Sequence, residues 1–86
     1  MPIPNNLSRE HILGAAEQRN KGRLIPKRRN ARTIALSIDG KKYPVKILIS
    51  WGHEIATGQE LNSNLFTSDD AVNCLRNLGF TDFVSP

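Results

Sequence analysis

The dipeptide Asp39-Gly40 joins two short segments of alternating side chains, and this arrangement limits the folds open to the chain more than any other feature. Before the dipeptide, Ile34, Leu36 and Ile38 alternate with small or polar residues, which is typical of a half-buried strand. After it, residues 41–43 are expected to return as a second strand. Asp-Gly is a strong signal for the tight turn of a β-hairpin. The sequence therefore predicts an antiparallel hairpin near the middle of the chain.

Three helices are predicted around this hairpin, each from a start signal, an apolar stripe and a stop signal. Their expected limits are Ser8 to about Asn20, Pro44 to Gly58, and Thr67 or Ser68 to Gly79. Pro44 suits a first helical position, and residues 80–84 are apolar enough to form a closing strand. The expected fold class is α+β: a small single domain spanning residues 1–86, with about three to four helices and a short antiparallel sheet built on the hairpin.

The small size of the chain argues against an enzyme. Eighty-six residues can bury one modest core but cannot enclose a deep cavity between two lobes. The sequence contains no Ser/His/Asp arrangement, phosphate-cradling glycine loop or His/Cys zinc spacing, so no catalytic residue, metal or cofactor is predicted. The single cysteine, Cys74, excludes an internal disulfide and is expected to be a buried thiol. No apolar run is long enough for a signal peptide or a membrane span, which favours a cytoplasmic location.

Positive charge is concentrated in one part of the sequence. Ten of the twelve Lys and Arg residues lie between Arg19 and Lys46, and only Asp39 interrupts them. These ten are Arg19, Lys21, Arg23, Lys27, Arg28, Arg29, Arg32, Lys41, Lys42 and Lys46. Such a segment is typical of proteins that bind a polyanion, because each phosphate neutralised by Lys or Arg releases condensed counterions. A membrane surface is a weaker candidate, since Pro and Asn break the stretch and prevent a basic amphipathic helix. The alternative is that the basic residues only form a solvent-exposed surface that binds no partner.

Several short pieces of the sequence together resemble a known family. These pieces are GKKYP (40–44) with Lys46, ATGQEL (56–61), Phe66, Asn73 and LRNLGF (75–80). Their order is similar to that in the sulfur-binding domains of type IV, modification-dependent restriction endonucleases, and the similarity covers about residues 29–84. The resemblance implies a non-enzymatic module that binds phosphorothioate-modified duplex DNA in bacterial defence. In full-length enzymes of this kind, the module lies beside a separate nuclease domain.

The resemblance also implies a set of DNA-binding residues. The sulfur pocket would consist of Tyr43, Pro44 and Ile47 together with an arginine, for which Arg29 is the best candidate and Arg28 and Arg32 are alternatives. Backbone phosphates would be held by Lys27, Arg28, Arg32, Lys42 and Lys46. Such a site is physically reasonable. The cations pair with the negatively charged phosphate, and a shallow apolar pocket contacts the sulfur atom, which accepts hydrogen bonds poorly.

This chain departs from the family pattern at three places. It lacks the second proline that the family usually carries after the first. It carries Ile47 where the family has a small residue, which predicts a shallower or differently shaped pocket. It also reads TSDD after Phe66, where the family often has a pair of glycines. If Asp69 and Asp70 faced the DNA, they would repel phosphate.

The residues leave other interpretations open. Tyr43 and Pro44 are also what a hairpin end and a helix start require, and Ile47 shares an apolar stripe with Trp51 that suits a core. The same basic surface could serve a general DNA- or RNA-binding domain without sulfur recognition. It could also serve a protein-interaction adaptor whose basic loop binds an acidic partner.

Overall fold

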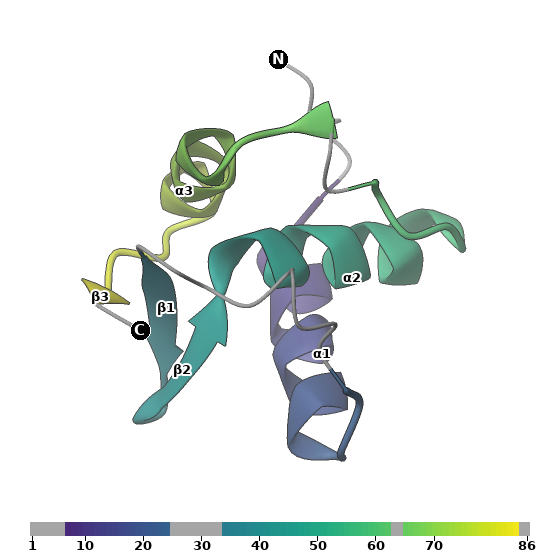
Figure 1. Cartoon of the computed structure of the whole chain (residues 1–86), viewed down its shortest axis with the longest axis horizontal. Coiled ribbons are helices and arrows are strands. Elements are labelled where there is room, and N and C mark those ends of the chain that lie inside the picture. Colours follow the sequence, from purple (N-terminus) through teal and green to yellow (C-terminus); the bar gives the residue numbers. More distant parts are fainter. Residues whose placement is uncertain (1–6, 25–33, 63–64, 85–86) are drawn as a thin grey trace.

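The computed structural model of the chain describes residues 7–24, 34–62 and 65–84. Along the sequence, the elements are α1 (Arg9–Asn20), β1 (Ala35–Ile38), β2 (Lys41–Pro44), α2 (Val45–Thr57), α3 (Ser68–Asn77) and β3 (Phe83–Val84). The three strands form one antiparallel sheet in the order β2-β1-β3, and the helices lie around it (Figure 1). The predicted α+β fold class is therefore confirmed. Within the described ranges, no helix is long and apolar enough to span a lipid bilayer.

The predicted hairpin is present, with its turn at Asp39-Gly40. Both turn residues have positive φ angles, 51° for Asp39 and 81° for Gly40, as a two-residue turn that follows the twist of the strands requires. In the resulting register, Leu36 lies opposite Tyr43, and both side chains are buried. Phe83 of β3 pairs with the other side of Leu36, which confirms the predicted closing strand over its last two residues.

The helix ends follow the start and stop signals in the sequence. At the start of α3, the Thr67 backbone N–H donates to the Asp70 carboxylate at 3.0 Å, and the Asp70 N–H donates to the Thr67 hydroxyl at 3.1 Å. This reciprocal pair satisfies two backbone donors of the first turn. The start of α2 was predicted one residue too early: Pro44 is extended, at φ −60° and ψ 129°, and belongs to β2, so the helix begins at Val45. Gly58 ends α2 in the left-handed conformation (φ 86°), as predicted.

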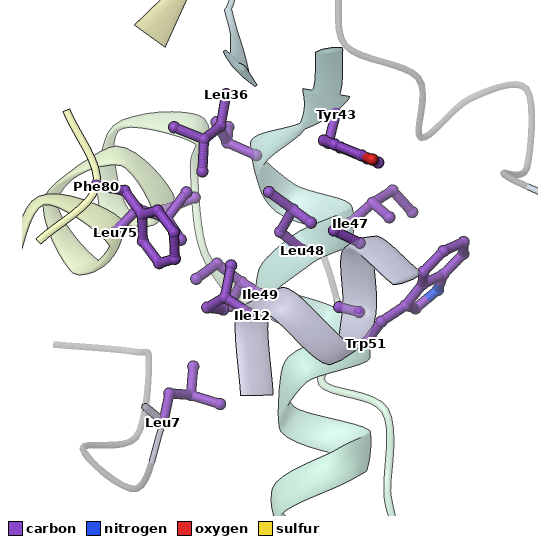
Figure 2. Close-up of a cluster of buried hydrophobic side chains, with 14 of the residues drawn as sticks. Leu7, Ile12, Leu36, Tyr43, Ile47, Leu48, Ile49, Trp51, Leu75 and Phe80 are labelled. Carbon is purple, nitrogen blue, oxygen red and sulfur yellow. The ribbon is translucent and has the colours of Figure 1, made fainter. Parts of the chain in front are cut away.

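The core is built around α2, which contacts α1, α3 and β2. Seven of its first eight residues are buried, Lys46 being the exception. Figure 2 shows side chains from several elements meeting there, with Tyr43 of the sheet near Ile47 of α2 and Ile12 of α1 near Ile49 of α2. Trp51 is 1% exposed, which confirms its expected place in the core. Burial of one large apolar side chain stabilises a fold by about 1.5–3 kcal/mol. A different path from β2 into α2 would expose several of these side chains, so the cluster fixes the geometry of this junction.

Candidate nucleic-acid interface

The described part of the basic segment places its cations on neighbouring elements. Arg19 and Lys21 lie at the end of α1, Lys41 and Lys42 lie on β2, and Lys46 lies in the first turn of α2. All are exposed except Lys46, which is partly exposed. The remaining predicted DNA-binding cations lie outside the described residues; these are Lys27, Arg28, Arg29 and Arg32. Lys41 is tied to the end of α1 through Asn20, whereas the Lys46 ammonium lies over the Phe66 ring, 5.3 Å from its centroid.

Asn20 holds the two ends of the basic segment together. Its side-chain Oδ1 accepts a hydrogen bond from the Tyr43 hydroxyl at 2.8 Å and another from Lys41 Nζ at 3.4 Å. These bonds attach the last turn of α1 to β2, although Asn20 and Tyr43 are 23 residues apart in the sequence. The sequence analysis treated Asn20 only as the end of a helix, because no local pattern indicates so distant a contact.

The residues predicted to form the sulfur pocket are adjacent at the junction of β2 and α2. Tyr43 is 3% exposed and Ile47 is 1% exposed, and both belong to the core; Figure 2 shows their side chains next to each other. Pro44 is partly exposed at the start of α2. Among these three residues, only Pro44 presents substantial surface to a ligand, and Arg29, their predicted companion, lies outside the described residues. The role of this group in sulfur recognition stays a prediction.

The start of α2 differs from the starts of α1 and α3. Both of those helices carry an acidic residue in the first turn, whereas α2 has none and carries Lys46 there. Among the described residues, no side chain caps α2, and Pro44, which has no capping group, occupies the N-cap position. The first backbone N–H groups of a helix lack intrahelical partners and carry partial positive charge. This end of α2 is therefore electrostatically suited to an anion such as a backbone phosphate.

Arg23 differs from the exposed cations of the segment, because its charge is neutralised in a partly buried cluster, whereas the ion pair of Lys21 with Glu17 lies on the surface. Its guanidinium stacks on the Trp51 ring, 4.2 Å from the ring centroid. It also pairs with the carboxylates of Glu54, at 2.9 Å, and Glu60, at 3.4 Å. Its side chain is only 30% exposed. Arg23 therefore serves to attach the chain after α1 to α2, and it contributes little to the charge that a polyanion would meet.

A half-open pocket of about 290 Å³ lies between α1 and the hairpin, beside the cluster around Asn20. Four residues of α1 line it, and they are spaced as one helical face: Leu13, Ala16, Glu17 and Asn20. The hairpin supplies the opposite wall, formed by Ile38, Asp39, Lys41 and Tyr43. This pocket was not predicted from the sequence. The helical spacing of Leu13, Ala16, Glu17 and Asn20 indicates that they share one face of α1. It does not indicate that the hairpin packs opposite this face.

The described residues offer little for metal or nucleophile chemistry. They contain no group of three or more His, Cys, Asp or Glu side chains that could hold a metal ion. Burial raises the pKa of the Cys74 thiol, which opposes formation of the reactive thiolate. His53 Nδ1 lies 2.6 Å from the Gln59 carbonyl oxygen, so this nitrogen donates a hydrogen bond that fixes the local turn.

Comparison with known proteins identifies a family for this chain. The model of a family described as "ScoMcrA-like, N-terminal head domain" matches residues 5–82. No curated protein and no solved structure matches the chain. The matched range includes α1, the hairpin, α2 and α3 and ends just before β3, so the likeness extends over almost all of the described fold.

Proposed function

Because the chain belongs to the family of ScoMcrA-like N-terminal head domains, we propose that it is a DNA-binding module of a restriction system that reads phosphorothioate-modified duplex DNA. The family match confirms the resemblance to a domain of type IV restriction systems. A role in binding, with cleavage left to a separate nuclease, agrees with the description of the family as a head domain.

The observation that carries the proposal is the start of α2. No described side chain caps this helix N-terminus, which has Lys46 in its first turn and exposed Lys42 just before it. Backbone donors and two cations therefore occur together, with the Lys46 ammonium over the Phe66 ring. A DNA phosphate supplies the negative charge that this arrangement lacks. The Pro44 ring lies at the same place and offers the apolar surface that a sulfur atom would contact.

Burial of the pocket residues favours a second candidate function. Because the Ile47 side chain is 1% exposed, it cannot touch a ligand unless the junction of β2 and α2 opens. General DNA binding through the same cations, without a preference for sulfur, requires no such opening. The two functions therefore differ in whether a single sulfur atom changes the affinity.

The test is a titration of the chain with matched duplexes that differ only in one phosphorothioate, with its two stereoisomers measured separately. We expect one of the modified duplexes to bind more tightly than the unmodified duplex, because the exchange of oxygen for sulfur keeps the charge and adds an apolar contact. Equal affinity for all three duplexes would leave the general DNA-binding function. Binding to acidic polypeptides and to none of the duplexes would support an adaptor instead.

Two variants separate sulfur recognition from phosphate binding. Pro44→Ala should reduce the preference for the modified duplex while changing the affinity for unmodified DNA little. Lys42→Ala should weaken binding of both duplexes by the same factor, because a phosphate contact carries charge and not identity. If Pro44→Ala lowers both affinities equally, Pro44 is a structural corner and not part of a sulfur site. Tyr43→Ala is unsuitable for this test, because the Tyr43 side chain belongs to the core.

A further inference from the structure

The pocket between α1 and the hairpin has a different chemical character from the basic surface around it. Two acidic residues, Glu17 and Asp39, line it together with Lys41 and Asn20, and the Glu17 carboxylate also pairs with Lys21 at 3.3 Å. A phosphate is disfavoured beside two carboxylates, because like charges repel. The lining instead suits a neutral ligand that has both hydrogen-bond donors and acceptors.

The Asn20 amide has a fixed orientation at this pocket. Lys41 can only donate hydrogen bonds, so the Asn20 atom that it contacts must be the oxygen, and Tyr43 donates to the same atom. The Nδ2 group is thereby left to donate to a further acceptor, since the described residues supply none. The Asp39 carboxylate can accept from a ligand amine, and so can the second oxygen of Glu17, whose Oε1 pairs with Lys21. Together these groups match the polar edge of a nucleobase, which alternates acceptors with N–H donors.

The pocket also has the size and the apolar surface that a nucleobase requires. Its volume of about 290 Å³ is at the lower limit of small-molecule sites, which are typically about 300–1,000 Å³. Leu13 is 42% exposed and lines the pocket with Ala16 and Ile38, so it offers an apolar face for a flat ring. A site of this size can hold one nucleobase ring system, but it is too small to enclose a whole nucleotide together with its phosphate.

One cation lines this pocket and two more adjoin one of its lining residues in the sequence, so the phosphates on either side of such a base would pass close to positive charge. Lys41 lines the pocket from the hairpin, and Arg19 and Lys21 lie next to Asn20 at the end of α1. Phosphate contacts set the register of a bound strand, whereas base contacts supply sequence information. A pocket with donors and acceptors beside these cations combines both kinds of contact.

We propose that this pocket receives one extrahelical nucleobase of the bound DNA and so gives the module a base preference. The inference rests on the proposed function only in that the chain binds DNA, and it does not require sulfur recognition. Extrusion of a base from a duplex costs a few kcal/mol and costs least where the base is already unpaired. The pocket should therefore be detected most easily with DNA that presents an unpaired base.

The experiment compares duplexes that contain a single-nucleotide bulge, with each of the four bases in turn, against the same duplex with an abasic bulge. The abasic duplex has the same backbone distortion but no base. Binding of the full chain to at least one base-containing bulge should be about tenfold tighter than to the abasic bulge, the scale expected for one stacked base.

A matched pair of double variants assigns this preference to the pocket. Leu13→Ala with Glu17→Gln alters the pocket wall, whereas Ile55→Ala with Glu10→Gln makes the same changes in net charge and apolar surface at residues that do not line it. Ile55 is 41% exposed, close to the value for Leu13. The pocket variant should lose most of the base preference and keep its affinity for the abasic duplex relative to the control variant, which should keep both.

The outcomes distinguish this proposal from the proposed function. Equal affinity for base-containing and abasic bulges, or a base preference that survives in the pocket variant, would overturn the pocket while leaving the DNA-binding module intact. Failure of the chain to bind any of these duplexes would overturn the proposed function and the pocket with it.

Discussion

Tyr43 shows how one residue can serve the fold and lie beside a binding surface at once. Its ring is buried among core residues, while its hydroxyl reaches Asn20 next to the pocket. Truncation of a buried aromatic side chain to alanine typically costs about 3–5 kcal/mol. Small domains have a total stability of about 5–15 kcal/mol. The two contributions of Tyr43 must therefore be separated by removal of the hydroxyl alone.

Tyr43→Phe should lower the free energy of unfolding by about 1 kcal/mol, because one intramolecular hydrogen bond is lost and the ring stays in place. Asn20 keeps its bond from Lys41, so the end of α1 remains close to β2. Urea unfolding of the two proteins, with unchanged dependence on urea concentration, would measure the difference. An unchanged or higher stability would show that the bond between Tyr43 and Asn20 does not hold α1 to the hairpin.

At the scale of elements, two glycines mark the contact between α1 and α2. A Cβ atom added at Gly52 would lie 3.1 Å from the Ile12 Cδ1, and one added at Gly14 would lie 2.9 Å from the Ile55 Cδ1. The distances are similar but the surroundings differ, since Ile12 is completely buried whereas Ile55 is 41% exposed. The Ile55 side chain can therefore rotate toward solvent, and the Ile12 side chain cannot.

The paired substitutions Gly14→Ala and Gly52→Ala should change stability in opposite directions. Alanine is favoured over glycine in a helix by about 1 kcal/mol, and Gly14→Ala should gain part of this. Gly52→Ala should be destabilising on balance, because overpacking a tight core contact typically costs about 1–3 kcal/mol. Thermal unfolding of both variants measures the signs. If both substitutions stabilised the protein, α1 and α2 would be able to move apart without a loss of stability.

The attachment of Arg23 to α2 gives a second prediction at this scale. Arg23→Ala should lower the free energy of unfolding by about 1–3 kcal/mol, because it removes a cation–π contact and two partly exposed ion pairs. Arg23→Lys keeps the charge but loses the planar stack on Trp51, so it should recover only part of the stability. Chemical denaturation of the three proteins tests this order. If Arg23→Lys had the full stability of the unaltered chain, the charge alone would account for the attachment of this segment to α2.

The elements that the sequence predicted well depend on neighbouring residues. The turn at Asp39-Gly40 and the cap at Thr67 are set by residues within a few positions of each other. Pro44 was placed one position wrong, because a proline fits both the last residue of an edge strand and the first turn of a helix. The pair of Arg23 with Glu54 spans 31 residues and depends on how α1 and α2 cross. No local pattern contains that information.

At the scale of the whole molecule, size limits how much DNA the module can contact. The molecule measures 26 × 24 × 24 Å, and one strand of a duplex presents a phosphate about every 3.4 Å along its axis. One face can therefore lie along about seven base pairs, of which only the phosphates that face the protein are contacted. Neutralisation of about four to six phosphates is a reasonable expectation for the cations of residues 19–46.

The dependence of DNA affinity on salt should reveal which cations take part. With four to six phosphates neutralised, the slope of log affinity against log salt concentration should be about −4 to −5, and Lys42→Ala should reduce its magnitude by about 0.9. Arg23→Ala removes the same formal charge, but it should leave the slope unchanged, because Glu54 and Glu60 already neutralise Arg23. Titrations at several salt concentrations, with folded variants confirmed by circular dichroism, measure all three slopes. A slope near zero for the unaltered chain would exclude phosphate binding, and equal reductions in the two variants would show that Arg23 leaves its carboxylates to contact the DNA.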